Sequence, residues 1–133
     1  MNITLTLSEV VSLFIELNGD GKEFEGILKK ELTPKQKSIL GRLERFVAKE
    51  VESYEKIRKE LFVKHGDEPD KNGNITVPPA NIEAFKNEFD ELMTSEVPIS
   101  LSTLWTTPLT LDDLNNIKTK EYYKVLTKIL DNE

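Results

Sequence analysis

Between Pro34 and His65 the chain runs for 32 residues with proline only at the first position. Proline is tolerated in the first turn of a helix, and Thr33 before it is a residue type that caps helix N-termini. Gly66 follows the run and predicts a left-handed C-cap. Apolar residues recur every three or four positions along it: Leu40, Leu43, Val47, Tyr54, Ile57 and Leu61. The spacing predicts one long helix with an apolar stripe, so the chain must fold around a long rigid element.

A second helix is predicted after Pro78-Pro79, where apolar residues again recur at helical spacing. Its apolar positions are Ile82, Phe85, Phe89, Leu92 and Met93. We expect the two helices to fold back on each other as an antiparallel helical hairpin. Between them, Asn72-Gly73 predicts a tight turn and 75–77 a short strand, so a short β excursion is expected at the 67–78 turn.

The N-terminal region predicts a short strand and two helices. Residues 2–6 alternate in polarity and indicate a strand. Ser8 is the expected N-cap of a helix that runs to about Leu17. The glycines of Asn18-Gly19-Asp20-Gly21 predict a turn, and a short helix from about Lys22 to Lys30 is expected after it.

The C-terminal region predicts a short strand and two short helices. Residues 97–101 alternate and indicate the strand, or else an extended arm. Thr110 with Asp113 resembles a capping box, and Thr119 is the expected cap of the last helix. No internal repeat or linker divides the chain, and 133 residues suffice to bury one core. The sequence therefore predicts a mainly α fold, with 1–133 forming a single helical domain.

Composition and charge exclude several classes of protein. The net charge of −6 argues against direct nucleic-acid binding. The absence of cysteine excludes disulfides, thiolate nucleophiles and cysteine zinc sites, and it fits a reducing compartment. No segment approaches the ~18 apolar residues of a membrane-spanning helix. The apolar N-terminus lacks the basic start of a signal peptide, so we expect a cytoplasmic protein that does not associate with membranes.

The first half of the long predicted helix carries a row of basic residues. Between Pro34 and Lys49, five cations and one acid give a charge of +4, which leaves −10 for the rest of the chain. At about 100° per residue, four of these cations share one face. They are Lys35, Arg42, Arg45 and Lys49. Such a face is typical of a site for a phosphate, a nucleotide or an acidic patch of a partner, or else of a solvated helix surface.

The 67–78 turn has some features of a calcium-binding loop. Glu68, Asp70 and Asn72 fit the first three ligand positions of such a loop. The twelfth position, which should supply a bidentate glutamate, is Pro79. A polar turn stabilised by its Asn-Gly pair is therefore favoured, and we expect no metal site.

Residues typical of catalysis are few. The only histidine, His65, lies at the end of the long predicted helix and has no cysteine partner. No serine stands in a nucleophile motif, and no glycine loop has the spacing that cradles phosphates. We therefore expect a protein that is not an enzyme and has no cofactor. Trp105, the only tryptophan, is expected either to fill the core under a loop or to anchor an interface.

Residues 57–99 carry several motifs in a fixed order. Lys64-His65-Gly66 ends a helix, Asp70-Lys71-Asn72-Gly73-Asn74-Ile75 is an acidic turn, and the pattern L-x-x-x-E-V-x-I follows at Leu92–Ile99. Over about residues 55–101 this arrangement resembles small uncharacterised proteins of tailed bacteriophages. His65 stands where that pattern has a tyrosine. The resemblance implies phage origin and a role inside the host cell, and it assigns no catalytic or binding residues.

These observations lead to one principal expectation and two alternatives. The principal expectation is a non-enzymatic phage accessory protein that forms a homo-oligomer and acts by binding. It would capture or block a host defence factor, or a phosphate-bearing signal molecule resembling a nucleotide. The first alternative is a virion component, such as a tail or neck accessory protein. The second is an acidic mimic of DNA, which is less favoured because lysines are interspersed among the acids.

Overall fold

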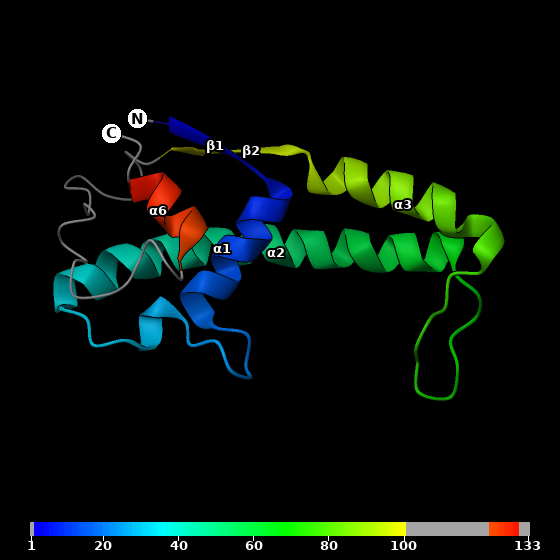
Figure 1. The fold of residues 1–133 in the computed structure, drawn as a ribbon, viewed down its shortest axis with the longest axis horizontal. Coiled ribbons are helices and arrows are strands. Elements are labelled where there is room, and N and C mark those ends of the chain that lie inside the picture. Colours follow the sequence, from blue (N-terminus) through cyan, green and yellow to red (C-terminus); the bar gives the residue numbers. More distant parts are fainter. Residues whose placement is uncertain (1, 101–122, 131–133) are drawn as a thin grey trace.

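The computed structural model describes residues 2–100 and 123–130, and its helices and strands are shown in Figure 1. In chain order the elements are β1 (Asn2–Thr6), α1 (Leu7–Asn18), the 3-10 turn η1 (Ile27–Lys29), α2 (Pro34–His65), α3 (Pro79–Met93), β2 (Glu96–Ser100) and α6 (Lys124–Leu130). The predicted mainly α fold with a small β component is confirmed. Trp105, Thr110, Asp113 and Thr119 lie outside the described residues.

Helix α2 begins and ends where the sequence predicts. The Thr33 hydroxyl accepts the Gln36 backbone N–H at 3.2 Å, and the Gln36 side chain accepts the Thr33 N–H at 2.9 Å. This reciprocal capping box starts the helix. The left-handed C-cap predicted at Gly66 is wrong, because Gly66 has φ −91° and ψ 166°. Glycine is needed there for space instead, since a Cβ would overlap the Ile75 side chain and the Phe62 carbonyl oxygen.

Helix α3 runs antiparallel to the second half of α2, as predicted, and the two project away from the rest of the described fold (Figure 1). The connecting loop is closed by backbone hydrogen bonds from Asp67 N–H to the Thr76 oxygen and from Asp70 N–H to the Asn74 oxygen, each 2.9 Å. The predicted strand at 75–77 does not form. Two cross-loop bonds are too few for a ladder, and the Asp70 side chain takes the N–H groups of Asn72 and Asn74.

The short strands predicted near residues 2–6 and 97–101 are confirmed, and they pair with each other. β1 and β2 are antiparallel, with Leu5 opposite Val97 and Ile3 opposite Ile99. Helix α1 follows β1 without a loop, so its N-cap is Thr6 and the predicted cap at Ser8 is wrong. The box formed by Thr6 and Glu9 has the S/T-x-x-E spacing that a sequence search can find.

The short helix predicted at 22–30 is reduced to the single 3-10 turn η1. Gly19 and Glu25 form an isolated antiparallel bridge, which draws the chain back against the end of α1. Gly26 then lies so close to that helix end that a Cβ would overlap the backbone of Leu17, Asn18 and Gly19. Because the chain around Gly26 is held against the end of α1, the residues before η1 do not form the first turns of the helix predicted at 22–30.

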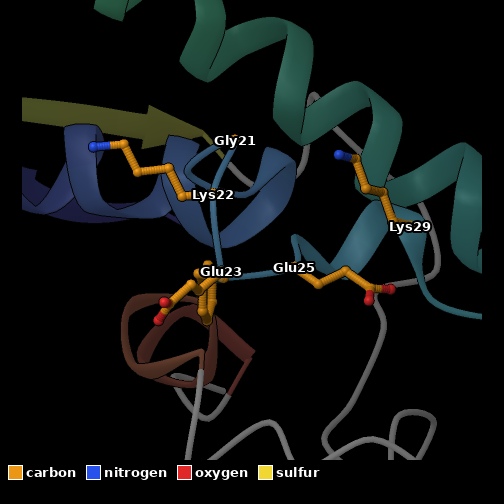
Figure 2. Close-up of a pocket in the computed structure, with 6 residues that line it drawn as sticks. Gly21, Lys22, Glu23, Glu25 and Lys29 are labelled. Atoms are coloured by element: carbon orange, nitrogen blue, oxygen red, sulfur yellow. The ribbon is translucent and has the colours of Figure 1, made fainter.

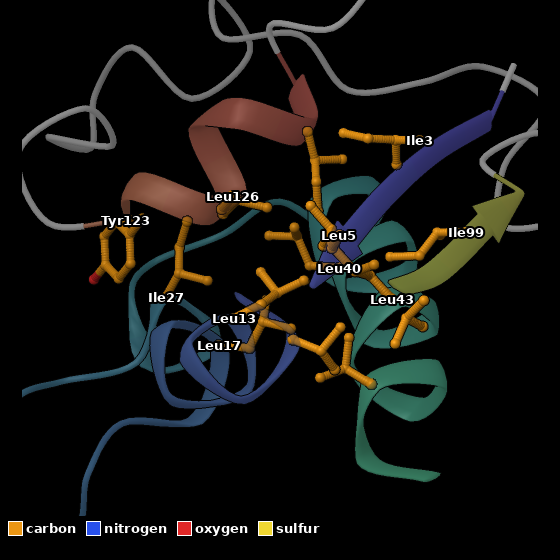
Figure 3. Packing of buried hydrophobic residues seen from close by; sticks show 14 of the residues in the cluster. Ile3, Leu5, Leu13, Leu17, Ile27, Leu40, Leu43, Ile99, Tyr123 and Leu126 are labelled. Carbon is orange, nitrogen blue, oxygen red and sulfur yellow. The ribbon is translucent and has the colours of Figure 1, made fainter. Parts of the chain in front are cut away.

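The core lies on the first half of α2, where α1, η1, the sheet and α6 pack together (Figure 3). Five side chains of α2 are buried: Ile39, Leu40, Leu43, Val47 and Tyr54. No residue of α2 after Tyr54 is buried, and α3 has no buried residue. The molecule therefore has a well-packed body and a projecting arm, which we define as residues 50–65 of α2, the loop 66–78 and α3.

Candidate functional site

All four predicted site residues lie on the exposed side of α2. Lys35, Arg42, Arg45 and Lys49 are exposed, whereas Leu40, Leu43 and Val47 on the opposite side are buried. The first and last cations, Lys35 and Lys49, are fourteen positions apart, so the row is about 21 Å long at 1.5 Å per residue. We call these four residues the basic face of α2.

Glu44, the acidic residue within the stretch from Pro34 to Lys49, does not neutralise the basic face. The Glu44 carboxylate lies on the α1 side of the helix, where it accepts a hydrogen bond from the Asn18 side chain at 3.4 Å. Among the described residues, Lys35, Arg45 and Lys49 have no acidic side chain within ion-pair distance. Arg42 already takes part in another interaction. Three of the four cations therefore present their charge to solvent.

The shape of the basic face limits the ligands that it suits. The row lies on one helix and is convex, whereas small-molecule sites are usually concave and bury most of their ligand. A convex row of cations fits an extended acidic surface, and the guanidinium groups can form paired hydrogen bonds to carboxylates.

A shallow hollow of about 360 Å³ lies beside η1, and no residue of the basic face lines it (Figure 2). Its lining residues are Gly21, Lys22, Glu23, Phe24, Glu25 and Lys29. Figure 2 shows the labelled lysines and glutamates pointing in different directions rather than toward a common point. The hollow therefore lacks the convergent polar groups that orient a ligand.

At the far end of the arm, one carboxylate joins the two helices. Glu88 of α3 forms an ion pair with Lys64 at 2.6 Å and a hydrogen bond with the His65 Nε2 at 2.5 Å. The hydrogen bond from Lys64, followed by that from His65, lowers the pKa of Glu88. The Asn81 side chain donates to the His65 carbonyl at 2.9 Å and so caps the end of α2. His65 is thus part of the junction between the two helices, and sequence reasoning missed Glu88 as its partner.

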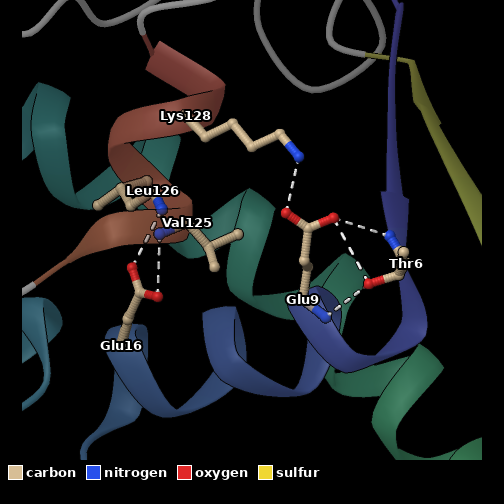
Figure 4. Close-up of polar contacts among 6 residues, drawn as sticks. All are labelled: Thr6, Glu9, Glu16, Val125, Leu126 and Lys128. Atoms are coloured by element: carbon tan, nitrogen blue, oxygen red, sulfur yellow. Dashed lines mark hydrogen bonds and ion pairs between the residues drawn. The ribbon is translucent and has the colours of Figure 1, made fainter. Parts of the chain in front are cut away.

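Sequence reasoning also missed two carboxylates on α1 that hold α6 (Figure 4). Glu16 is 7% exposed and accepts the backbone N–H groups of Val125 and Leu126. Glu9 accepts a hydrogen bond from the Lys128 ammonium at 2.7 Å. Glu16 follows the buried Leu13 by three positions, so helical spacing alone would have placed it on the inner side of α1.

The comparisons with known proteins identify no relative, since no family model, curated protein or solved structure matches the chain. Within residues 2–100 and 123–130, no three histidine, aspartate or glutamate side chains are placed to hold a metal ion together. The same residues include no helix that is both long and apolar enough to span a membrane.

Proposed function

We propose that this chain is a non-enzymatic protein that acts by binding, and that the basic face of α2 is its binding surface. One observation carries the proposal. In a protein of net charge −6, Lys35, Arg45 and Lys49 are exposed in one row and have no acidic partner among the described residues. An unneutralised row of one sign attracts an oppositely charged surface and speeds its association.

The ligand class that best suits this surface is an acidic patch on a partner protein. The face is long and convex, which favours a protein surface over a small phosphate-bearing molecule. The resemblance of residues 55–101 to phage proteins makes a host defence factor the class of partner to test first. Capture or obstruction of such a factor would need no chemistry from this chain.

The test compares two charge-reversed variants of equal net charge. In the first, Arg45→Glu and Lys49→Glu reverse the basic face. In the control, Lys22→Glu and Lys71→Glu reverse two exposed lysines elsewhere. Each tagged protein is used for affinity capture from bacterial cells, and the recovered partner is then purified and titrated at two salt concentrations.

The wild type and the control should bind the purified partner equally. The basic-face variant should bind at least tenfold more weakly, and raising the salt should weaken wild-type binding. Native mass spectrometry of the purified wild type would reveal a co-purified phosphate-bearing molecule, which would replace the protein partner as ligand. Equal binding by all three proteins would overturn the assignment of the basic face.

A further inference from the structure

The arm is only two helices thick, and this leaves the apolar side chains of α3 incompletely covered. α3 has 15 residues and an apolar face at helical spacing, yet none of its residues is buried. A helix of this length is marginal in water unless its apolar face is packed. No other described element lies along the outer half of the arm (Figure 1). Within the described residues, the outer half of the arm therefore has an apolar surface that is only partly covered.

The open apolar surface lies on one flank of the arm. At about 100° per residue, the apolar side chains beside the α2–α3 seam fall on the same side of both helices. They are Val51, Phe62, Ile82, Phe85, Phe89 and Met93, which we call the aromatic flank. Val51, Phe89 and Met93 also pack against the core, so the least covered part of the flank is formed by Phe62, Ile82 and Phe85. All six are at least partly exposed, and Ile82 is the most exposed of them at 48%.

Ring contacts make the aromatic flank a continuous surface. The Phe62 and Phe85 centroids lie 4.8 Å apart, and Phe85 stacks on Phe89 at 6.0 Å with an interplanar angle of 10°. The guanidinium of Arg58 lies 5.2 Å from the centre of the Phe62 ring. Partly exposed aromatic rings beside an arginine are typical of the centre of a protein interface.

The charges that border this flank favour a second copy of the chain as its occupant. On α2 the border carries Glu55, which also pairs with Arg58 of the same helix at 3.5 Å, and Lys59. On α3 it carries Lys86 and Asp90. Each pair has opposite signs four residues apart. A two-fold axis perpendicular to the helices reverses their direction, so each acid would face the lysine of the same pair in the other copy. A partner with one sign of charge would instead be repelled by half of this border.

We propose that two copies of the chain associate through their aromatic flanks, with the arms antiparallel and their four helices forming one bundle. This arrangement covers the partly exposed rings and pairs Lys86 of one copy with Asp90 of its partner on α3. The basic face of α2 lies on a different side of that helix, so both copies keep it exposed. The dimer therefore presents two basic faces to ligands.

The first test places a charge within the flank, near its outer end. Ile82→Glu introduces a carboxylate at a position that is already 48% exposed, so the monomer should still fold. The matched control is Val63→Glu, which adds the same charge at a position 71% exposed and about 180° around α2 from Tyr54. Sedimentation equilibrium should show the wild type and the control at twice 15.2 kDa. The Ile82 variant should dissociate with a constant about tenfold higher or more.

The second test first reverses the charge of Lys86 and then restores the net charge by reversing Asp90 as well. Lys86→Glu alone should place two acids opposite each other and weaken the dimer by about threefold to tenfold. Adding Asp90→Lys reverses the order of the pair but keeps it complementary, so the double variant should recover wild-type dissociation within about twofold. Circular dichroism of each variant establishes that the helices are intact.

A monomeric wild type at 100 µM, or Ile82→Glu and Val63→Glu variants with equal dissociation constants, would overturn this proposal. Failure of the Asp90→Lys exchange to restore Lys86→Glu would overturn the antiparallel arrangement. The outcome is separable from the proposed function, because Arg45→Glu with Lys49→Glu should leave the dimer intact while ligand binding is lost.

Discussion

The Glu16 carboxylate accepts the backbone N–H of Leu126 at 3.0 Å, across 110 positions of sequence. The neighbouring N–H of Val125 donates to the other carboxylate oxygen at 3.1 Å (Figure 4). These are N–H groups at the start of α6 that have no partner within the helix. A buried acid on α1 therefore fixes both the position and the start of the C-terminal helix.

Replacing Glu16 with alanine should destabilise the protein, because it removes the acceptor for both N–H groups. Leaving a buried N–H unpaired costs about 1–3 kcal/mol. We expect the free energy of unfolding in urea to fall by about that amount for Glu16→Ala. Glu31→Ala, at an exposed position, should change it by less than about 0.5 kcal/mol. Equal effects of the two changes would contradict the role of Glu16.

The two carboxylates that hold α6 should respond to pH in opposite directions. Burial raises the pKa of Glu16 above its ordinary value of 4.5, against the opposing effect of the hydrogen bonds from Leu126 and Val125. The folded state then binds the proton more tightly than the unfolded state. The contribution of Glu16 to stability is therefore lost as pH rises through its folded pKa.

For Glu9, burial acts to raise the pKa, but the hydrogen bonds from Lys128 and Thr6 outweigh it and the net pKa is lowered. Its contribution is present above pH 4.5 and is lost as pH falls through the folded pKa. Urea unfolding between pH 4 and pH 7 checks both directions. As pH falls toward 4.5, the wild type should become more stable relative to the Glu16→Gln variant. As pH falls further, below 4.5, the wild type should lose its stability advantage over the Glu9→Gln variant. The same trend for both variants would contradict this assignment.

Local sequence signals predicted most of the elements, because those elements depend on nearby residues. The start of α2 follows from Thr33 and Pro34, and the antiparallel course of α3 follows from a short connection between two apolar stripes. The pairing of β1 with β2 joins residues 90 to 98 positions apart, so periodicity alone predicted each strand but not its partner. The helix expected at 22–30 failed because Gly26 packs against the end of α1, which is a tertiary contact.

Burial along α2 is uneven, although its apolar spacing is regular. Leu40 is fully buried in the core of the body, whereas Leu61 lies in the arm and is only partly buried. We expect Leu40→Ala to lower the free energy of unfolding by about 2–5 kcal/mol, as for a buried leucine. Leu61→Ala should cost roughly 1 kcal/mol, because less apolar surface is lost. Similar costs for the two, measured by urea unfolding at one protein concentration, would show that the arm is covered as well as the body.

The candidate site was predictable only in part. Exposure of the basic face follows from helical geometry, since Lys35, Arg45 and Lys49 lie opposite a buried stripe. The engagement of Glu44 with Asn18 depends on how α1 crosses α2, and the junction of His65 with Glu88 depends on the length of the loop between the helices. Neither partner can be read from spacing within one helix.

Two glycines should respond in opposite ways to the same substitution. A Cβ at Gly26 would overlap the backbone of Leu17, Asn18 and Gly19, which cannot move without disturbing the end of α1. Gly26→Ala should therefore destabilise the protein by about 2 kcal/mol or more. Gly41 lies inside α2, where a Cβ would meet only the Arg45 Nη1 at 3.6 Å, an ordinary contact. Gly41→Ala should stabilise the protein by about 0.5–1 kcal/mol, because alanine loses less backbone entropy in a helix. Thermal unfolding followed by circular dichroism measures both changes, and a Gly26→Ala variant as stable as Gly41→Ala would show that the chain does not pass this close to α1.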